Sequence, residues 1–222
     1  MPRAIIFDFD GLLVDTETAI YESWKTVYSD HDQFLELETY KQCVGSDFGQ
    51  FNPEDELERR TGRAFDWTSI NIKREQAIRE QLATQDARPG VREFLERATD
   101  AGIKLAVASS SSRAWVAGWL EKLGIRQHFD ALRNRDDVTR IKPYPDLFLS
   151  ACKALDISPS QSLVMEDSEN GLRAAKAAGI PCVIVTNPVT EGGDFRDAML
   201  KTECFTSPSV RQLVNETNTD EG

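Results

Sequence analysis

Two aspartates stand one residue apart near the N-terminus, directly after an apolar run. Residues 4–18 read AIIFDFDGLLVDTET, so that Asp8 and Asp10 follow the strand-like residues 4–7. Alternate residues of a strand point to the same side. Two carboxylates about 4 Å apart repel each other by roughly 4 kcal/mol at an effective dielectric constant of about 20. The sequence therefore predicts a positive group beside this pair.

Polar residues also follow three later apolar runs of the chain. They are Ser109 and Ser110 after residues 104–108, Lys142 in the loop beyond residues 129–132, and Glu166 and Asp167 after residues 162–165. In open parallel sheets, ligands bind beyond the carboxyl ends of the strands, where such residues would meet. Carboxylate oxygens suit Mg²⁺, hydroxyl and ammonium groups suit phosphate, and a carboxylate can attack phosphorus. The pattern predicts phosphoryl transfer.

Apolar periodicity predicts the elements that carry these residues. In the second half of the chain, the short apolar runs at 104–108, 162–165 and 182–185 alternate with helical stripes. Alternation of strand and helix is typical of a parallel sheet that is covered on both faces. We therefore expect an α/β fold, a Rossmann-like parallel sheet with helices on both sides. The stripe of Trp115 and Trp119 is interpreted as part of its core.

A helical region interrupts this alternation. Ile20 belongs to a helical stripe, Asn52 followed by Pro53 is typical of a helix start, and Gly62 is typical of a helix end. No convincing strand pattern accompanies them. We expect two domains, which are an α/β core formed by residues 1–15 and 86–222 and an all-helical cap formed by residues 16–85.

Composition limits the partners of the protein. Of 222 residues, 40% are hydrophobic, the formal net charge is −11, and the pI is about 4.8. An acidic surface argues against binding to nucleic acid or to an anionic membrane. No apolar run approaches the ~20 residues of a membrane-spanning helix, and we expect no signal peptide. The four widely separated cysteines indicate free thiols in a cytoplasmic protein, which we expect to be a monomer.

Taken together, the motifs resemble those of the haloacid dehalogenase (HAD) superfamily. The start DFDG, the first serine of VASSS, the lysine of KPYPD and the run EDSENG follow the order and spacing of that superfamily along most of residues 1–187. They are similar to its β-phosphoglucomutase-like branch, which has a small helical cap. The resemblance implies a Rossmann-like core, an enzyme of the hydrolase type and a Mg²⁺ cofactor.

The resemblance implies distinct roles for the residues that handle phosphate. Asp8 is the nucleophile that becomes phosphorylated. Asp10 protonates the leaving oxygen and then activates the water that hydrolyses the intermediate. Lys142 orients Asp8 and, with Ser109 and Ser110, holds the transferring phosphate.

The resemblance also implies a metal site and a moving cap. Mg²⁺ would bind the carboxylates of Asp8 and Asp167, the backbone carbonyl of Asp10, and Glu166 either directly or through a water. Gly11 would form a tight turn beside the site. Closure of the cap would exclude water and select the substrate.

Several reactions use this fold, and four positions of this chain separate them. Asp10 speaks against haloacid dehalogenases proper and against phosphonoacetaldehyde hydrolases, which lack this second aspartate. β-Phosphoglucomutase carries a cap histidine four residues beyond the threonine that matches Thr16, where this chain has Ile20. It also has a lysine and an arginine in the cap loop, where Val44 and Phe48 align. We therefore predict a phosphatase for a small phosphomonoester, such as a sugar or polyol phosphate.

Two alternatives stay open. One is a phosphosugar mutase of the β-phosphoglucomutase type, and the other is a phosphate- or partner-binding protein on the same scaffold without turnover. The cap segments expected to face the leaving group offer few charges, which favours a small monophosphate over a polyanion. Phosphoglycolate and 2-deoxyglucose 6-phosphate also stay open as substrates.

Overall fold

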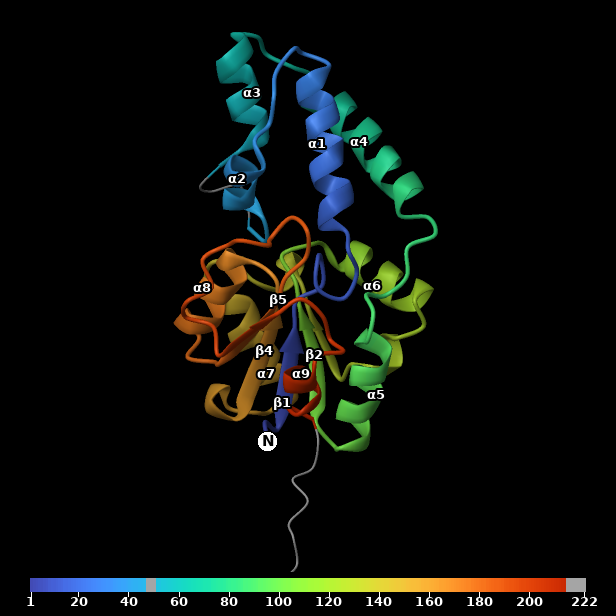
Figure 1. Ribbon diagram of the computed structural model, residues 1–222, viewed down its shortest axis with the longest axis vertical. Coiled ribbons are helices and arrows are strands. Elements are labelled where there is room, and N and C mark those ends of the chain that lie inside the picture. Colours follow the sequence, from blue (N-terminus) through green and yellow to red (C-terminus); the bar gives the residue numbers. More distant parts are fainter. Residues whose placement is uncertain (47–50, 215–222) are drawn as a thin grey trace, which may run out of the picture.

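Six parallel strands form a sheet within residues 1–46 and 51–214, which are the residues that the structure describes (Figure 1). The structure is a computed structural model. In sheet order the strands are β3 (Ala131–Arg133), β2 (Lys104–Ala108), β1 (Ala4–Phe7), β4 (Ser162–Glu166), β5 (Cys182–Val185) and β6 (Leu200–Thr202). β1 pairs in parallel with both β2 and β4. Asp8 therefore leaves the sheet near its middle.

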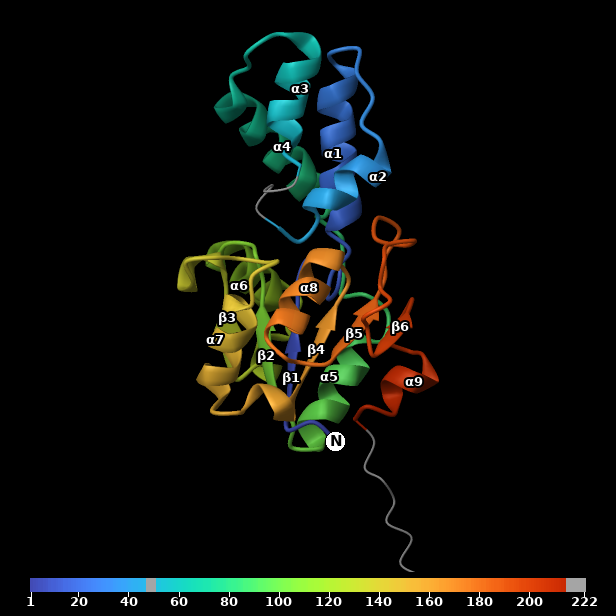
Figure 2. The ribbon, with the colours of Figure 1, turned by 90° about the vertical axis from the view of Figure 1, so that its left-hand side faces the viewer.

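Helices cover both faces of the sheet (Figure 2). They are α5 (Val91–Asp100), α6 (Arg113–Lys122) and α9 (Pro208–Arg211) on one face, and α7 (Asp146–Leu155) and α8 (Glu169–Ala177) on the other. Along β1, Ile5 and Phe7 pack into the first layer, whereas Ala4 and Ile6 pack into the second. Because both faces are buried, the central strands are continuous apolar runs rather than alternating ones.

Four further helices stand apart from the sheet, beyond the carboxyl ends of its strands (Figures 1 and 2). They are α1 (Glu17–Ser29), α2 (Leu37–Tyr40), α3 (Pro53–Thr61) and α4 (Trp67–Gln81). They share a hydrophobic cluster around Trp24 and Tyr28. α3 begins after Asn52, whose side chain accepts a hydrogen bond from the Glu54 N–H, and ends at Gly62 in the left-handed conformation. No strand occurs between residues 16 and 85 in the part of the chain described.

The expected strands agree with the observed ones to within one residue except at the edges of the sheet. β2 and β5 have the predicted bounds, and β4 extends one residue further, through Glu166. β3 starts at Ala131 instead of residue 129, because residues 126–128 form a 3₁₀ turn that delays the strand. β6 was not expected, since its three residues are partly or fully exposed and lack an apolar pattern. The predicted fold class is confirmed.

Two other expectations concern cysteines and membranes. All four cysteines are free, as the sequence indicates. Among residues 1–46 and 51–214, every helix is too short or too polar to cross a bilayer.

Arg88 ties the second linker between the helical region and the sheet to three other segments. Its backbone N–H donates to the carbonyl of Leu13 at 2.9 Å. Its guanidinium donates to four carbonyl oxygens, those of Gly11 (2.6 Å), Val185 (3.2 Å), Thr186 (2.6 Å) and Glu203 (3.1 Å). A planar guanidinium with five N–H donors can serve several acceptors at once. Arg88 therefore fixes the turn at Gly11 against the ends of β5 and β6.

We predict that Arg88→Ala lowers the free energy of unfolding by about 2–3 kcal/mol, because several backbone carbonyls lose a charged donor. Arg88→Lys should recover only part of this loss, since an ammonium lacks the fork of donors. Urea unfolding measures both. Arg97→Ala is the matched control. The Arg97 side chain is exposed and forms a surface ion pair with Glu93 at 3.9 Å. This substitution should lower the free energy of unfolding by less than about 0.5 kcal/mol. An equally small loss from Arg88→Ala would contradict the prediction.

Candidate active site

Lys142 lies between two carboxylates at the carboxyl edge of the sheet. Its Nζ donates to Oδ1 of Asp8 and, at 2.6 Å, to Oε1 of Glu166. Lys142 and Glu166 are fully buried, and Asp8 is 6% exposed. Carboxylate oxygens of Asp8, Glu166 and Asp167 lie within 4.8 Å of one another. The structure thus brings together polar residues that lie at or beyond the carboxyl ends of β1, β3 and β4.

Glu166 uses both of its oxygens on the protein itself. Oε1 accepts from Lys142, and Oε2 accepts from the backbone N–H groups of Asp167 and Ser168, both at 2.9 Å, and from the Ser168 hydroxyl at 3.0 Å. The carboxyl group lies against Gly171, where a Cβ would come 1.8 Å from Cδ of Glu166. The glycine of EDSENG therefore makes room for Glu166 at the start of α8.

Asn187 is a residue of this site that the sequence analysis missed. Its Nδ2 donates to Oδ2 of Asp167 at 2.6 Å and to the carbonyl of Gly11 at 3.1 Å. Gly11 has a φ of 75°, and a Cβ there would come 2.3 Å from the same Asp167 oxygen. Asn187 thus fixes the direction of the Asp167 carboxylate. The argument from strand ends, extended to β5, would have identified it.

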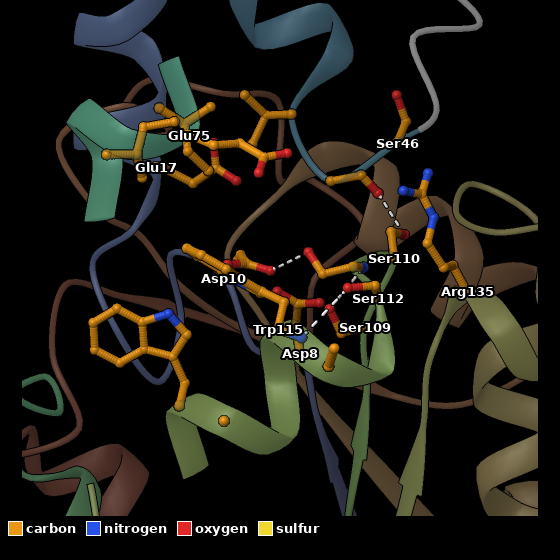
Figure 3. Close-up of a pocket in the computed structure, with 18 of the residues that line it drawn as sticks. Asp8, Asp10, Glu17, Ser46, Glu75, Ser109, Ser110, Ser112, Trp115 and Arg135 are labelled. Carbon is orange, nitrogen blue, oxygen red and sulfur yellow. Dashed lines mark hydrogen bonds between the residues drawn. The ribbon is translucent and has the colours of Figure 1, made fainter. Parts of the chain in front are cut away.

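Asp10 has neutral donors around its carboxylate. Its Oδ1 accepts from the Thr16 hydroxyl and from Nε1 of Trp115, both at 2.8 Å, and its Oδ2 accepts from the Ser111 hydroxyl at 2.5 Å. Asp10 and Trp115 lie beside each other in the cleft (Figure 3). The interpretation of Trp115 as a core residue is therefore incomplete. Its ring packs against the core, while its N–H reaches the site.

The serines that follow β2 have different partners. Ser109 is buried, and its hydroxyl oxygen accepts from the backbone N–H two residues further on at 3.0 Å. The Ser110 hydroxyl donates to the carbonyl of Gly45 at 3.0 Å, which joins the loop after β2 to the loop after α2 (Figure 3). Ser112 is the N-cap of α6 and accepts from the Trp115 backbone N–H at 3.3 Å.

A cleft of about 920 Å³ opens between α1, α2 and α4 and this edge of the sheet (Figure 3). Asp8, Asp10 and the serines that follow β2 line one side of it. Ile20 from α1 and Val44 from the loop after α2 line it as well, whereas Thr16 is buried and reaches it through Asp10. Phe48 lies outside the described residues.

Charged side chains that the sequence analysis did not assign also line the cleft. They are Glu17, Glu75, Arg79, Lys122 and Arg135. The cleft is therefore more highly charged than the cap segments considered in the sequence suggest. Helical periodicity shows which face of α4 or α6 is polar, but it does not show which polar residues face the cleft. These charges became apparent only from the packing of the helices over the sheet.

Burial controls the protonation of the central groups. It raises the pKa of Asp8 from 3.8 to about 8, although the charge of Lys142 acts in the opposite direction. Burial and the negative charge of Glu166 raise the pKa of Asp167 well above its ordinary value. Burial also favours the neutral form of Lys142. The negative charges of Asp8 and Glu166 outweigh the effect of burial and raise the pKa of Lys142. A cation beside Asp8 and Asp167 would restore their charged forms.

The donor set fits a divalent cation. Three buried carboxylates share one ammonium group, so negative charge is in excess. Carboxylate oxygens are ligands that Mg²⁺ prefers. Because both oxygens of Glu166 already have protein donors, Asp8 and Asp167 are better suited than Glu166 to bind a metal directly.

Glu17, at the start of α1, is a buried carboxyl group that faces the cleft. It is 6% exposed, and it forms no hydrogen bond or ion pair with residues 1–46 or 51–214. Burial and the neighbouring charges of Asp10 and Asp8 raise its pKa well above 4.5. Its charged form is therefore costly in the folded protein.

We predict that Glu17→Gln raises the free energy of unfolding at pH 7.5 by about 1 kcal/mol in metal-free protein, because the variant avoids this cost. The folded pKa of Glu17 lies above the unfolded value, so wild-type stability falls relative to the variant as the pH rises above 4.5. Below that pH both states are protonated, and the difference should vanish. Urea unfolding at several pH values measures it. Glu75→Gln, an exposed position in the same cleft, should show no such trend.

Comparison with known sequences places the chain in one family. The model of the family described as "Haloacid dehalogenase-like hydrolase" matches residues 5–185. The chain is 38% identical over 218 residues to "Putative phosphatase YhcW" of Bacillus subtilis (strain 168), which covers 98% of this chain and 99% of the relative.

Solved structures agree with this assignment. CbbY from Rhodobacter sphaeroides, in complex with xylulose-(1,5)bisphosphate, is 28% identical with a TM-score of 0.74, covering 92% of this chain and 95% of that one. A putative β-phosphoglucomutase from Thermotoga maritima is 26% identical with a TM-score of 0.70, covering 90% and 93%. The chain therefore belongs to the haloacid dehalogenase-like hydrolase family, in its β-phosphoglucomutase-like branch.

Proposed function

We propose that the protein is a Mg²⁺-dependent phosphatase, which hydrolyses a small phosphomonoester through an aspartyl phosphate at Asp8. The observation that carries this proposal is the pairing of buried Lys142 with Asp8 and Glu166, beside Asp167 and open to a cleft. It supplies a carboxylate nucleophile, a fixed positive charge and a donor set for a metal. The reaction class is phosphoric monoester hydrolysis. The free cysteines support a reducing compartment such as the cytoplasm.

The two aspartates divide the chemistry. An Asp8 oxygen attacks phosphorus while the bond from phosphorus to the alcohol oxygen breaks, and the Asp10 carboxyl group gives its proton to that oxygen. Asp10, now a carboxylate, then takes a proton from the water that attacks the phosphoaspartate, and Asp8 and inorganic phosphate are released. Asp8 is held by Lys142, whereas Asp10 lies on the cleft side among neutral donors, which suits these different roles.

The remaining residues hold charge and position. Lys142, the Ser109 hydroxyl and the Ser110 backbone N–H bind the phosphate, because the Ser110 hydroxyl is engaged by Gly45. Glu166 positions Lys142. Mg²⁺ on Asp8, the Asp10 carbonyl and Asp167 would draw charge from the phosphate.

Residues 16–85 act as a cap over residues 1–15 and 86–222. Three contacts support this proposal. Ser110 donates to the Gly45 carbonyl, the Asn170 side chain donates to the Val44 carbonyl at 2.9 Å, and the Lys41 ammonium donates to the Glu191 carbonyl at 2.8 Å. They hold the loop after α2 on the core, and residues of α4 and α6 line the cleft as well.

The substrate class is a sugar or polyol phosphate. Several polar groups of the cleft lie on the leaving-group side, among them Glu17 and Arg79. Hydroxyl groups of a polyol can bond to such groups. The xylulose bisphosphate in the CbbY structure shows that a relative of this fold binds a phosphorylated sugar.

A bisphosphate substrate is a second candidate, because Arg79, Lys122 and Arg135 line the cleft. These cations could bind a second phosphate without the cap-loop cations of β-phosphoglucomutase. A panel of phosphorylated metabolites that compares kcat/KM for mono- and bisphosphates separates the two classes. A bisphosphate preference that disappears in Arg79→Ala or Arg135→Ala would favour the second candidate.

We predict that Asp8→Asn lowers Mg²⁺-dependent hydrolysis of p-nitrophenyl phosphate by at least about 10³-fold, since the nucleophile is lost. EDTA should abolish the wild-type activity, and added Mg²⁺ should restore it. Phosphate release is the measurement. Asp197→Asn, an exposed residue in a surface ion pair with Lys176, should keep wild-type activity. Activity that neither Asp8→Asn nor EDTA changes would refute the mechanism, and phosphate binding without turnover would favour a non-catalytic role.

We predict that β-glucose 1-phosphate, if it is turned over, yields free phosphate rather than glucose 6-phosphate. Ile20 supplies no proton-transferring group where β-phosphoglucomutase has a histidine, and Val44 supplies no cation. Coupled assays for glucose 6-phosphate and for inorganic phosphate distinguish the products. Rapid interconversion of the two glucose phosphates with little free phosphate would establish the mutase instead.

A further inference from the structure

Trp115 lies in the first turn of α6 and reaches the acid of the proposed mechanism. Its Nε1 donates to Oδ1 of Asp10 at 2.8 Å. Its ring packs against the core of the α/β domain and meets the ring of Trp119 edge to face, with centroids 5.9 Å apart. Arg79 of α4 lies over the same ring at 6.0 Å. The indole is therefore fixed by packing on several sides.

The three donors around Asp10 differ in what they can do. The hydroxyls of Thr16 and Ser111 rotate, and each can either donate or accept. An indole N–H can only donate. Oδ1 of Asp10, which faces the indole, is therefore kept as a hydrogen-bond acceptor. A proton on Asp10 is therefore directed to Oδ2. There the carboxyl O–H can donate a hydrogen bond to the Ser111 hydroxyl oxygen, until the leaving group replaces Ser111 as the acceptor.

We propose that Trp115 is a positioning residue, which fixes the Asp10 carboxyl group and keeps its transferable proton on Oδ2. This inference rests on the proposed phosphatase reaction, in which that proton passes to the leaving oxygen. Ser111 and Thr16 alone leave the carboxyl group able to exchange its oxygens by rotation. The indole restricts this freedom because its ring is held between the core, the Trp119 ring and Arg79.

Phenyl phosphate and p-nitrophenyl phosphate provide a matched pair of probes. They have nearly the same shape, but phenolate is the poorer leaving group and depends more on a proton from Asp10. Trp115→Phe keeps an aromatic ring and removes the N–H. We expect this variant to lower kcat/KM for phenyl phosphate about 10-fold, and kcat/KM for p-nitrophenyl phosphate by less than about twofold. Trp67→Phe removes an indole N–H that donates to Glu58 instead, at a residue that does not line the cleft, and it should leave the ratio of the two kcat/KM values unchanged.

A second measurement needs neither metal nor turnover. Nitrogen-15 spectra of the metal-free protein contain the indole signals of its four tryptophans, and Trp115→Phe identifies the signal of Trp115. Asp10→Ala should move that indole signal more than the other three, because its acceptor is lost. The matched substitution Asp15→Ala should not, since Asp15 bonds to Thr18 instead.

The outcomes separate this inference from the proposed function. A wild-type enzyme that hydrolyses both probes, together with an unchanged ratio in Trp115→Phe, would overturn the role of Trp115 and leave the phosphatase intact. An Asp10→Ala spectrum in which the Trp115 signal does not move would also overturn it. Absence of Mg²⁺-dependent hydrolysis in the wild type would instead refute the proposed function, and the spectrum would still report on the contact between Trp115 and Asp10.

Discussion

The ion pairs of Lys142 are the interaction on which the rest of the site depends. An ammonium group in the interior is tolerated only when it is paired, and here it contacts Asp8 and Glu166 at once. Removing Lys142 would leave the buried carboxylates of Asp8 and Glu166 without a positive partner. Glu166 is one of the two carboxylates that pair with Lys142. It is held in place because the backbone N–H groups of Asp167 and Ser168 and the Ser168 hydroxyl bond to its other oxygen. Asp8 is the other carboxylate that pairs with Lys142, and it also lines the cleft.

Much of the site could be predicted from sequence because a parallel sheet places its strand ends together. Asp8, Ser109 and Asp167 each follow a short apolar run, and the register of β1 with β2 and β4 brings those runs to one edge. The sheet, its central strands and the helical nature of residues 16–85 follow from the same patterns. The edge strand β6 does not, since its residues are partly exposed and carry no periodicity.

The residues that escaped prediction are those whose role depends on how separate elements face each other. Trp115 belongs to a helical stripe that is also a core stripe, and only the position of α6 beside the turn after β1 shows that its N–H meets Asp10. The sequence shows Arg79 and Lys122 only as cations on two separate helices. Their place in the cleft follows from the packing of α4 over α6. Glu17 reads as a favourable acidic residue at a helix start, but the structure buries it beside two other carboxylates.

Asp8 and Asp10 show why one motif needs two different surroundings. They are separated by one residue, yet Asp8 is 6% exposed and bound to an ammonium group, whereas Asp10 is partly exposed and accepts from hydroxyl and indole donors. A charged partner favours the ionised form that the proposed nucleophile requires, and the neutral donors hold the carboxyl group of the proposed acid in a fixed position. The turn at Gly11, held by Arg88 and Asn187, directs the chain so that the two side chains enter these separate environments.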